Sequence, residues 1–424
     1  MSYPSIKLPI SHIEEFRRRV NDNDHLILNN KPYRQSWNIL CACMDRIEDT
    51  ARYLNSKVLG EKHDYGCAFD LMEFLSHSAS MLDCIDTIIE TLKAEAIIKD
   101  PEIIFKGKVV TDRKKLKERL DKTKIKKPYK NEDDLYFEYI RSIGVVHPNS
   151  TNHHLYFQQY KKEVSPFLIW NGLVGLTGGD ISLHVYDSNG EDDGIHSLKL
   201  QLAEIYAYII NRYNRIPVLK DVFCSQINSL TTKLKTQKIL SENNFDDYGK
   251  YLLYLKTEAH KRNEYTEYCV DETMKMIGLN GIPKAINEKY LKYCNALKYA
   301  MNNLRHILQA PIFDDDFNED ILAQELHLPS LLREDESDGV RYYYEKTSKL
   351  YDSDRYGKDD IDWARTQAKI LYKIVREYAL VDDDVLDRLG NLQLLAVLNT
   401  ALYFYSLEHD TFINKKIPKT NTYR

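Results

Sequence analysis

Arg141 and His147 are the two residues whose types and spacing are best suited to chemistry. They flank the run SIGVV within YFEYIRSIGVVHPNSTNHH, so five residues separate a permanent cation from a titratable ring. Cleaving RNA without a metal needs a group that takes or gives a proton, and a histidine with a pKa of about 6.5 can do so at neutral pH. It also needs a positive charge beside the charged phosphorane, which a guanidinium supplies. The pair therefore suits metal-independent phosphodiester cleavage.

The same spacing occurs elsewhere, because Arg18 and Arg19 precede His25 at suitable distances. That stretch, RVNDNDH, is polar and shows no helical stripe. The context of Arg141 is different, since an apolar linker follows it and a basic segment precedes its helix. We therefore prefer the Arg141 pair as the candidate site.

The elements around this pair are predicted to be two consecutive helices. Asn131 is a suitable N-cap for a helix that runs through DLYFEYIRSIGVV and ends before Pro148, because the residue preceding a proline avoids the α region. A second helix is predicted over HHLYFQQYKKEV. An alternative without chemistry stays open: Arg141 pairs with Glu138 one turn earlier, and His147 only packs where the helix ends.

An arginine, five residues and a histidine at a helix junction resemble the signature of HEPN-superfamily ribonucleases. The resemblance covers residues 35–165 and includes no other specific motif, and Ser142 departs from the Asn or Asp that often follows the arginine. It implies a helical bundle that forms a homodimer, so that two copies of the motif share one cleft. It assigns Arg141 to the phosphate and His147 to proton transfer, with Ser142 and Asn152 as supporting hydrogen-bond partners. It also implies an antiviral defence or toxin role in a microbial cell, with a regulatory partner or antitoxin.

A strongly basic segment precedes the predicted helix of Arg141. From Lys106 to Lys130 it carries twelve Lys or Arg residues against three acidic ones, although the whole chain has a net charge of −5. Basic segments attract phosphate backbones by releasing counterions, so RNA is the expected partner. A solvated loop or helix face remains the plain alternative. The expected RNA contacts are Lys114, Lys115, Lys117, Arg119, Lys124, Lys126 and Lys127.

Composition predicts a mainly α-helical protein of more than one domain. The chain has 424 residues, of which 43% are hydrophobic, and glycine and proline are sparse. We expect a HEPN-like helical domain over 1–165 with a basic insertion at 105–130, and a C-terminal helical domain over 201–424. Between them, over 166–200, the alternating runs ISLHVYD and IHSLKL predict a Gly-rich β-hairpin segment.

Hydrophobic periodicity places the individual helices. In one of them the stripe Leu291, Cys294, Leu297, Met301, Leu304 and Leu308 is expected to face the core. In another, Phe69 begins the apolar pattern. The predicted helices span 35–56, 66–96, 199–213, 218–235, 246–261, 284–309, 362–379 and 383–407.

Several other classes of protein lack support in the sequence. The seven cysteines show no C-x2-C pair, and DDDFNED has no EF-hand spacing, so no metal or cofactor is expected. The chain also contains no P-loop, Rossmann or nucleophile-elbow motif. No apolar run approaches the roughly 20 residues of a membrane span, and the first residues are unlike a signal peptide, so we expect a cytoplasmic protein with reduced thiols. The alternative to the ribonuclease is a non-catalytic helical scaffold, or a regulatory protein that binds RNA or protein.

Overall fold

The structure is a computed structural model that describes residues 5–30, 36–59, 66–98, 102–106, 130–142, 163–164, 168–170, 180–187, 195–262, 264–309 and 340–409. These residues are mainly helical, which confirms the predicted fold class. The chain divides into two compact units, Met1–Ser229 and Leu230–Arg424, and the division falls inside one long helix. Among the helices described, none is long and apolar enough to cross a membrane.

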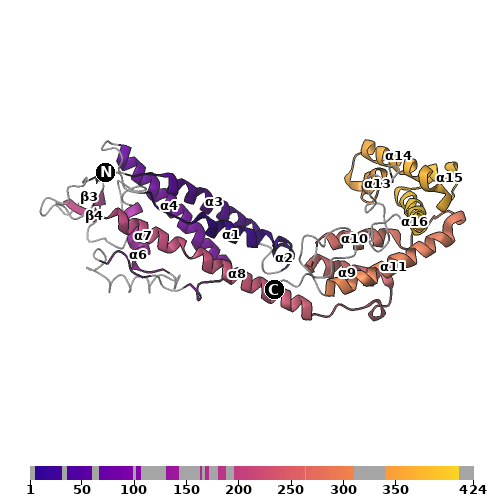
Figure 1. Ribbon diagram of the computed structural model, residues 1–424, viewed down its shortest axis with the longest axis horizontal. Helices are drawn as coiled ribbons and strands as arrows, with labels where there is room; N and C mark the ends of the chain where they lie inside the picture. The colour runs from indigo at the N-terminus through magenta and orange to yellow at the C-terminus, as the bar shows by residue number, and fades with distance from the viewer. Residues whose placement is uncertain are drawn as a thin grey trace. The chain divides into compact units, whose positions relative to one another are not determined.

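The first unit is built around two long antiparallel helices, α3 and α4 (Figure 1). α1 lies against α3, while α6 and α7 lie against α4. The sequence grouped α7 with the C-terminal helices, whereas here it belongs to the unit that holds α6. The helices of this unit are α1 (Ile10–Asn21), α2 (Asp24–Asn29), α3 (Trp37–Ser56), α4 (Gly66–Thr91), α6 (Glu132–Arg141), α7 (Leu202–Tyr213) and most of α8 (Ile216–Thr236).

α1 corrects the interpretation of the segment before His25. Helix α1 has a buried stripe of Ile13, Phe16 and Val20, so Arg18 lies on a packed amphipathic helix instead of an unstructured polar stretch. The stretch RVNDNDH looked polar because it contains only the last member of this stripe, Val20, followed by the polar residues at the end of the helix. Phe16 packs edge-on against Phe223 of α8, with ring centroids 6.1 Å apart.

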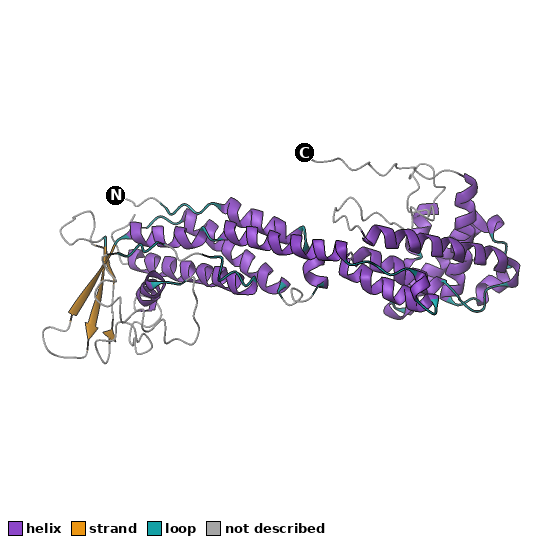
Figure 2. Cartoon of the chain, turned by 90° about the horizontal axis from the view of Figure 1, so that it is seen from below, coloured by secondary structure: helices purple, strands orange, loops and turns teal. Residues whose placement is uncertain are grey.

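A small antiparallel sheet belongs to the first unit (Figure 2). Its strands are β1 (Glu163–Val164), β2 (Leu168–Trp170), β3 (Ile181–Asp187) and β4 (Ile195–Leu200). The β3–β4 pairing, from Ile181↔Leu200 to Tyr186↔Ile195, confirms the predicted hairpin. β1 and β2 pair along the other edge of β3 and were not predicted. β1 occupies the last two residues of a segment that we predicted to be helical, and the rest of that segment lies outside the described residues.

The second unit is a helical domain whose core includes α16. Residues 394–398 of α16 are all fully buried, so this helix is covered on every side. α14 and α11 lie against α16, α13 lies against α14, and α9 lies against α10. The helices are α9 (Tyr248–Arg262), α10 (Glu264–Met276), α11 (Asn287–Gln309), α13 (Val340–Lys346), α14 (Lys358–Val375), α15 (Asp383–Arg388) and α16 (Asn391–His409), with short 3-10 helices η4 (Glu242–Asn244), η5 (Lys284–Ile286), η8 (Ser348–Leu350), η9 (Ser353–Arg355) and η10 (Arg376–Tyr378).

Three details of the predicted helices differ in the structure. α10 was missed, and the helix expected over 383–407 is broken into α15 and α16, because Leu389 is extended and α16 begins at Asn391. Leu291 on α11 is 54% exposed and Phe69 on α4 is 69% exposed, although both belong to apolar patterns. The remaining members of the α11 stripe are buried as predicted. Hydrophobic periodicity identifies the apolar face of a helix, but it does not show how far along the helix a neighbouring element covers that face.

Replacing Phe16 by alanine tests the packing of α1. Phe16 is fully buried, so Phe16→Ala should lower the free energy of unfolding by about 3–5 kcal/mol through lost burial and the cavity that remains. Phe69→Ala is the matched control, because it removes an exposed ring and should change stability by less than about 0.5 kcal/mol. Urea denaturation of the full chain measures both, and equal effects would contradict the packing.

A charged pocket beside Arg141 as the candidate functional site

Helix α6 carries Arg141 in its last turn, and its first residues fix where the helix begins. The side chain of Asn131 accepts a hydrogen bond from the N–H of Asp133 at 3.0 Å, and Asp134 accepts one from the N–H of Asn131 at 2.7 Å. This capping box satisfies N–H groups that have no partner within the helix. The predicted N-cap is therefore confirmed. Ser142 is the C-cap of α6 with helical backbone angles, and the predicted continuation of the helix toward Pro148 lies outside the described residues.

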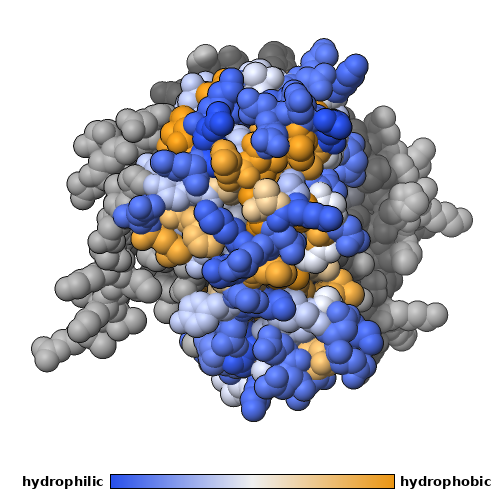
Figure 3. Space-filling model, turned by 90° about the vertical axis from the view of Figure 1, so that its right-hand side faces the viewer, coloured by the Kyte–Doolittle hydropathy of each residue, from blue (hydrophilic) through white to orange (hydrophobic). Residues whose placement is uncertain are grey.

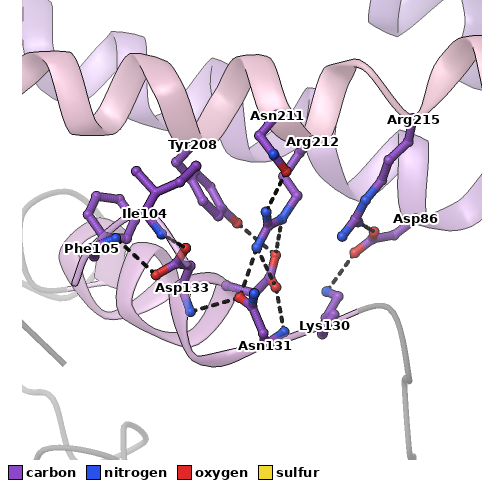
Figure 4. A network of polar contacts seen from close by, with 11 residues as sticks. Asp86, Ile104, Phe105, Lys130, Asn131, Asp133, Tyr208, Asn211, Arg212 and Arg215 are labelled. Carbon is purple, nitrogen blue, oxygen red and sulfur yellow. Dashed lines mark hydrogen bonds and ion pairs between the residues drawn. The ribbon is translucent and has the colours of Figure 1, made fainter. Parts of the chain in front are cut away.

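Asp133 attaches α6 to the segment that precedes the basic insertion. Its carboxylate accepts hydrogen bonds from the backbone N–H groups of Ile104, at 2.6 Å, and Phe105, at 3.2 Å (Figure 4). The residue is fully buried, and this burial raises the pKa of its carboxyl against the lowering effect of the two N–H groups. Asp133 thus holds residues 104–105 at the N-terminus of α6.

Asp134 and Arg212 form a buried ion pair between α6 and α7. The guanidinium donates from Nε to one carboxylate oxygen at 2.9 Å and from Nη2 to the other at 3.0 Å. Its remaining bonds go to Asn131 and Asn211, each at 2.9 Å, and it lies 4.6 Å from the centre of the Tyr208 ring (Figure 4). The Tyr208 hydroxyl also donates to Asp134 at 2.9 Å.

The pKa of Asp134 shows which effect dominates at this pair. Burial alone would raise the pKa of the carboxyl, but the charge and hydrogen bonds of Arg212 and the N–H of Asn131 outweigh it, so the pKa lies below its ordinary value. The carboxylate is therefore ionised whenever the chain is near neutral pH. Two-point pairing of this kind orients both side chains as well as neutralising them.

A second ion-pair group extends the network to α4. Asp86 lies 2.6 Å from the ammonium of Lys130 and 3.7 Å from the guanidinium of Arg215 (Figure 4). Burial raises the pKa of Asp86 despite these two cations. Burial, together with the nearby charge of Arg212, lowers the pKa of Arg215. Lys130 keeps a raised pKa, because Asp86 outweighs the effect of burial on the ammonium.

These groups line a polar pocket of about 100 Å³, which is room for about three water molecules. Arg141 and Glu138 are among the residues that line it, on the face of α6 that also carries Asp134. Arg141 is half-buried, and it makes no hydrogen bond or ion pair with any residue in the described part of the chain, Glu138 included. The alternative in which Arg141 simply pairs with Glu138 is therefore not what this geometry shows. The pocket-lining residues are Ala79, Leu82, Asp83, Ile85, Asp86, Lys130, Asp134, Phe137, Glu138, Arg141, Tyr208, Arg212 and Arg215.

The predicted site residues are described only in part. Arg141 lines the pocket, whereas Ser142 is buried and is not among the pocket-lining residues. The other predicted site residues lie outside the described part of the chain, so their arrangement around Arg141 stays a prediction. They are His147, Asn152, Lys114, Lys115, Lys117, Arg119, Lys124, Lys126 and Lys127.

Most of the pocket was not foreseen from the sequence. Asp86 interrupts the apolar pattern of α4, and Arg212 stands in the apolar run IYAYIINRY of α7, which is a detectable sign that each is buried with a partner. What the sequence lacks is the pairing, since Asp134 and Arg212 are 78 residues apart. Asp134 itself looked like an ordinary acidic residue in the first turn of a helix.

The arrangement can hold a small polar or anionic group beside a guanidinium, with the other pocket arginines engaged by carboxylates. Among the described residues no group of three or more His, Cys, Asp or Glu side chains is placed to hold a metal ion. Comparisons of the chain with protein-family models, with curated proteins and with solved structures find no match.

Removing either partner of the ion pair between Asp134 and Arg212 should destabilise the folded protein. Asp134→Asn leaves the guanidinium of Arg212 buried without its carboxylate, and Arg212→Met leaves the carboxylate without its cation. Each should lower the free energy of unfolding by about 3–5 kcal/mol, and the double variant should lose less than the sum. Asp45→Asn is the control, because its ion pair with Arg17 is exposed and is worth less than about 1 kcal/mol. Chemical denaturation provides the values, and a loss at Asp134 no larger than at Asp45 would contradict the assignment.

The lowered pKa of Asp134 predicts a specific pH dependence. Because its folded-state pKa lies below the ordinary value of 3.8, its stabilising contribution is present above that value and is lost as the pH falls through the folded pKa. Asp86 and Asp133, with raised pKa values, act in the opposite direction, so the comparison must be between variants. Between about pH 5 and pH 2, Asp134→Asn should lose less free energy of unfolding than the wild type does. Denaturation curves at a series of pH values test this, and parallel losses would refute it.

Proposed function

We propose that the first unit is a metal-independent endoribonuclease of the HEPN type, with Arg141 binding the scissile phosphate and His147 transferring protons. The observation that carries the proposal is the state of Arg141. It is a half-buried guanidinium at a polar pocket, and it makes no hydrogen bond or ion pair among the described residues. Leaving such a cation without a carboxylate has a cost that binding of an anionic ligand would offset.

The contrast with Arg212 supports this interpretation. Both arginines project from helices toward the same pocket, but Arg212 uses its donors on Asp134, Asn131 and Asn211. Arg212 therefore has a structural role. Arg141 has the same chemistry and no such partner in the part of the chain that the structure describes, so it is the pocket arginine best suited to a phosphate from outside.

The proposed reaction needs only proton transfers and charge stabilisation. The 2′-hydroxyl of the RNA attacks the adjacent phosphorus, its proton passes to a neutral histidine, and the bond from phosphorus to the 5′-oxygen breaks. A protonated histidine gives its proton to that leaving oxygen, which yields a 2′,3′-cyclic phosphate and a 5′-hydroxyl end. In a homodimer whose two motifs share one cleft, the two copies of His147 would take these complementary roles. Arg141 would stabilise the additional negative charge on the phosphorane.

The other parts of the proposal follow from the resemblance and from charge. The lysine and arginine residues of the basic segment would contact the RNA backbone, and Ser142 and Asn152 would support the pair by hydrogen bonds. Cleavage of cellular or phage RNA in a cytoplasmic setting would make the protein a toxin or an antiviral defence factor, restrained by a regulatory partner or antitoxin.

A second candidate is a non-catalytic helical protein that binds RNA or another protein. One observation favours it: Asp86, Lys130, Asp134 and Arg212 neutralise one another within the pocket, as expected for a purely structural network. In that case Arg141 would contribute only to binding affinity, and no bond would be broken.

The first experiment incubates the full chain with single-stranded RNA and transfer RNA in EDTA. Wild type should cleave both in the presence of the chelator and leave 2′,3′-cyclic phosphate ends. His147→Ala and Arg141→Ala should each reduce the rate by at least about a hundredfold, since each removes a group that acts in the transition state. The melting temperature of Arg141→Ala should stay within about 2 °C of wild type, because Arg141 has no hydrogen bond or ion pair to lose among the described residues. The melting temperature of His147→Ala is measured beside it, so that a loss of folding is recognised.

Arg18→Ala is the matched control for the loss of an arginine. Arg18 is exposed on α1 and precedes His25 at a distance similar to that between Arg141 and His147, so its removal should leave cleavage unchanged. Cleavage that persists in His147→Ala would exclude the proposed mechanism. Tight RNA binding without cleavage by wild type, weakened by Arg141→Ala, would instead support the second candidate.

A further inference from the structure

In the second unit the ammonium of Lys349 is held by two aromatic rings and a carboxylate. Its Nζ lies 5.5 Å from the centre of the Tyr356 ring and 5.6 Å from that of Trp363. It also donates a hydrogen bond to Asp360 at 2.5 Å. Attraction between a cation and the negative face of an aromatic ring extends to about 6 Å, so both rings contribute. Aromatic faces with a carboxylate are the chemistry that recognises alkylammonium groups.

Three neighbouring elements bring these residues together. Lys349 is in η8, Tyr356 directly follows η9, and Asp360 and Trp363 lie three residues apart on the first turns of α14. Residues at this spacing on a helix share a face, so the carboxylate and the indole are presented side by side. α14 packs against η8 and α16, which gives the group a rigid base.

The rings of this group are accessible from solvent. Tyr356 is 44% exposed and Trp363 is 42% exposed, whereas large aromatic rings that serve only the fold are usually covered. The face of the second unit in Figure 3 shows apolar side chains in separate patches among hydrophilic ones. Two exposed rings with charged residues beside them in the sequence suit a small ligand group better than a broad apolar interface.

The surrounding charge selects a cationic ligand over a nucleic acid. Exposed acidic residues outnumber exposed basic ones in the sequence around the rings. The exposed acids are Asp354, Asp359, Asp360 and Asp362, and the exposed cations are Arg355 and Lys358. An excess of carboxylates repels a phosphate backbone and attracts an ammonium. Stacking of RNA bases on these rings is therefore disfavoured, although the rings alone would permit it.

We propose that Tyr356, Trp363 and Asp360 form a binding site for an alkylammonium group, which Lys349 occupies in the free protein. The ligand would be the side chain of a lysine or methylated lysine on a partner, or a free polyamine, since both present the same chemistry. Lys349 sits on a flexible four-carbon stem and its side chain is 32% exposed, so it can leave the rings without disturbing α14. Lys349 then acts as an internal competitor that sets the affinity. This inference does not depend on the proposed ribonuclease activity.

A purely structural clamp is the competing explanation, and the two make different predictions. A clamp that loses Lys349 becomes less stable and gains nothing. A ligand site that loses its internal competitor binds an external ammonium more tightly. The decisive comparison therefore removes Lys349 and leaves Tyr356, Asp360 and Trp363 unchanged.

The test is a ligand-observed NMR titration of the full chain with three probes. They are a short peptide containing trimethyllysine, the same peptide containing acetyllysine, and spermine. Lys349→Met should bind the trimethyllysine peptide about tenfold more tightly than wild type, because two ring contacts become free. The neutral acetyllysine peptide should not bind. Tighter binding of the peptide than of spermine identifies a protein lysine as the ligand source, and the reverse order identifies a polyamine.

The control variant is Lys349→Met combined with Trp363→Ala, which should lose the gained affinity because one ring is removed. Lys349→Gln, which keeps a polar side chain at this position, is the second variant and should show the same gain as Lys349→Met. Circular dichroism establishes that each variant is folded. Unchanged affinity in both folded Lys349 variants, or equal binding of the acetylated peptide, would overturn the proposal.

Discussion

The ion pair between Asp134 and Arg212 is the interaction on which the arrangement of the first unit depends. A buried ion pair is worth little, or is unfavourable, unless its geometry is good and its remaining donors are satisfied. Here the pairing is two-pointed, Asn131 and Asn211 take the other donors, and Tyr208 covers the guanidinium. The network fixes both the distance between α6 and α7 and the rotation of α6 about its own axis. That rotation decides which residues of α6 line the pocket.

The same network determines where the basic segment begins and ends. Asp133 holds residues 104–105 at the N-terminus of α6, and Asp86 holds Lys130 immediately before the same helix. Residues 104–106 and Lys130, which flank the basic segment, are therefore both held beside the N-terminus of α6. Two adjacent carboxylates on α6 perform different tasks, and their pKa values shift in opposite directions, raised for Asp133 and lowered for Asp134. The difference arises because Asp134 is hydrogen-bonded to the guanidinium of Arg212, whereas Asp133 feels only the charge of that group.

The sequence was sufficient for features that depend on local patterns, and insufficient for those that depend on pairing across long distances. The cap at Asn131, the helix after it and the β3–β4 hairpin each follow from a few consecutive residues. Arg141 was chosen from its spacing to His147, and the structure adds that it lies at a pocket. The pocket itself required contacts between α4, α6 and α7, and no periodicity contains that information. The break at Gly390 was missed because both sides of it carry one continuous apolar pattern.

The second unit shows how this chain uses an arginine for structure alone. Arg262 on α9 is fully buried, pairs with Glu258 at 3.1 Å and donates to the backbone oxygen of Leu234 at 2.5 Å, which ties α9 to the last turns of α8. Arg212 follows the same pattern in the first unit, with a carboxylate on one side and oxygen acceptors on the other. Arg141 departs from this pattern, because it lines a pocket and lacks such acceptors among the described residues. Arg212 and Arg262 both direct most of their donors to acceptors within the fold, although Nε of Arg262 has no hydrogen-bond partner. This difference between the three arginines, seen among the described residues, is the physical basis for proposing a function at α6.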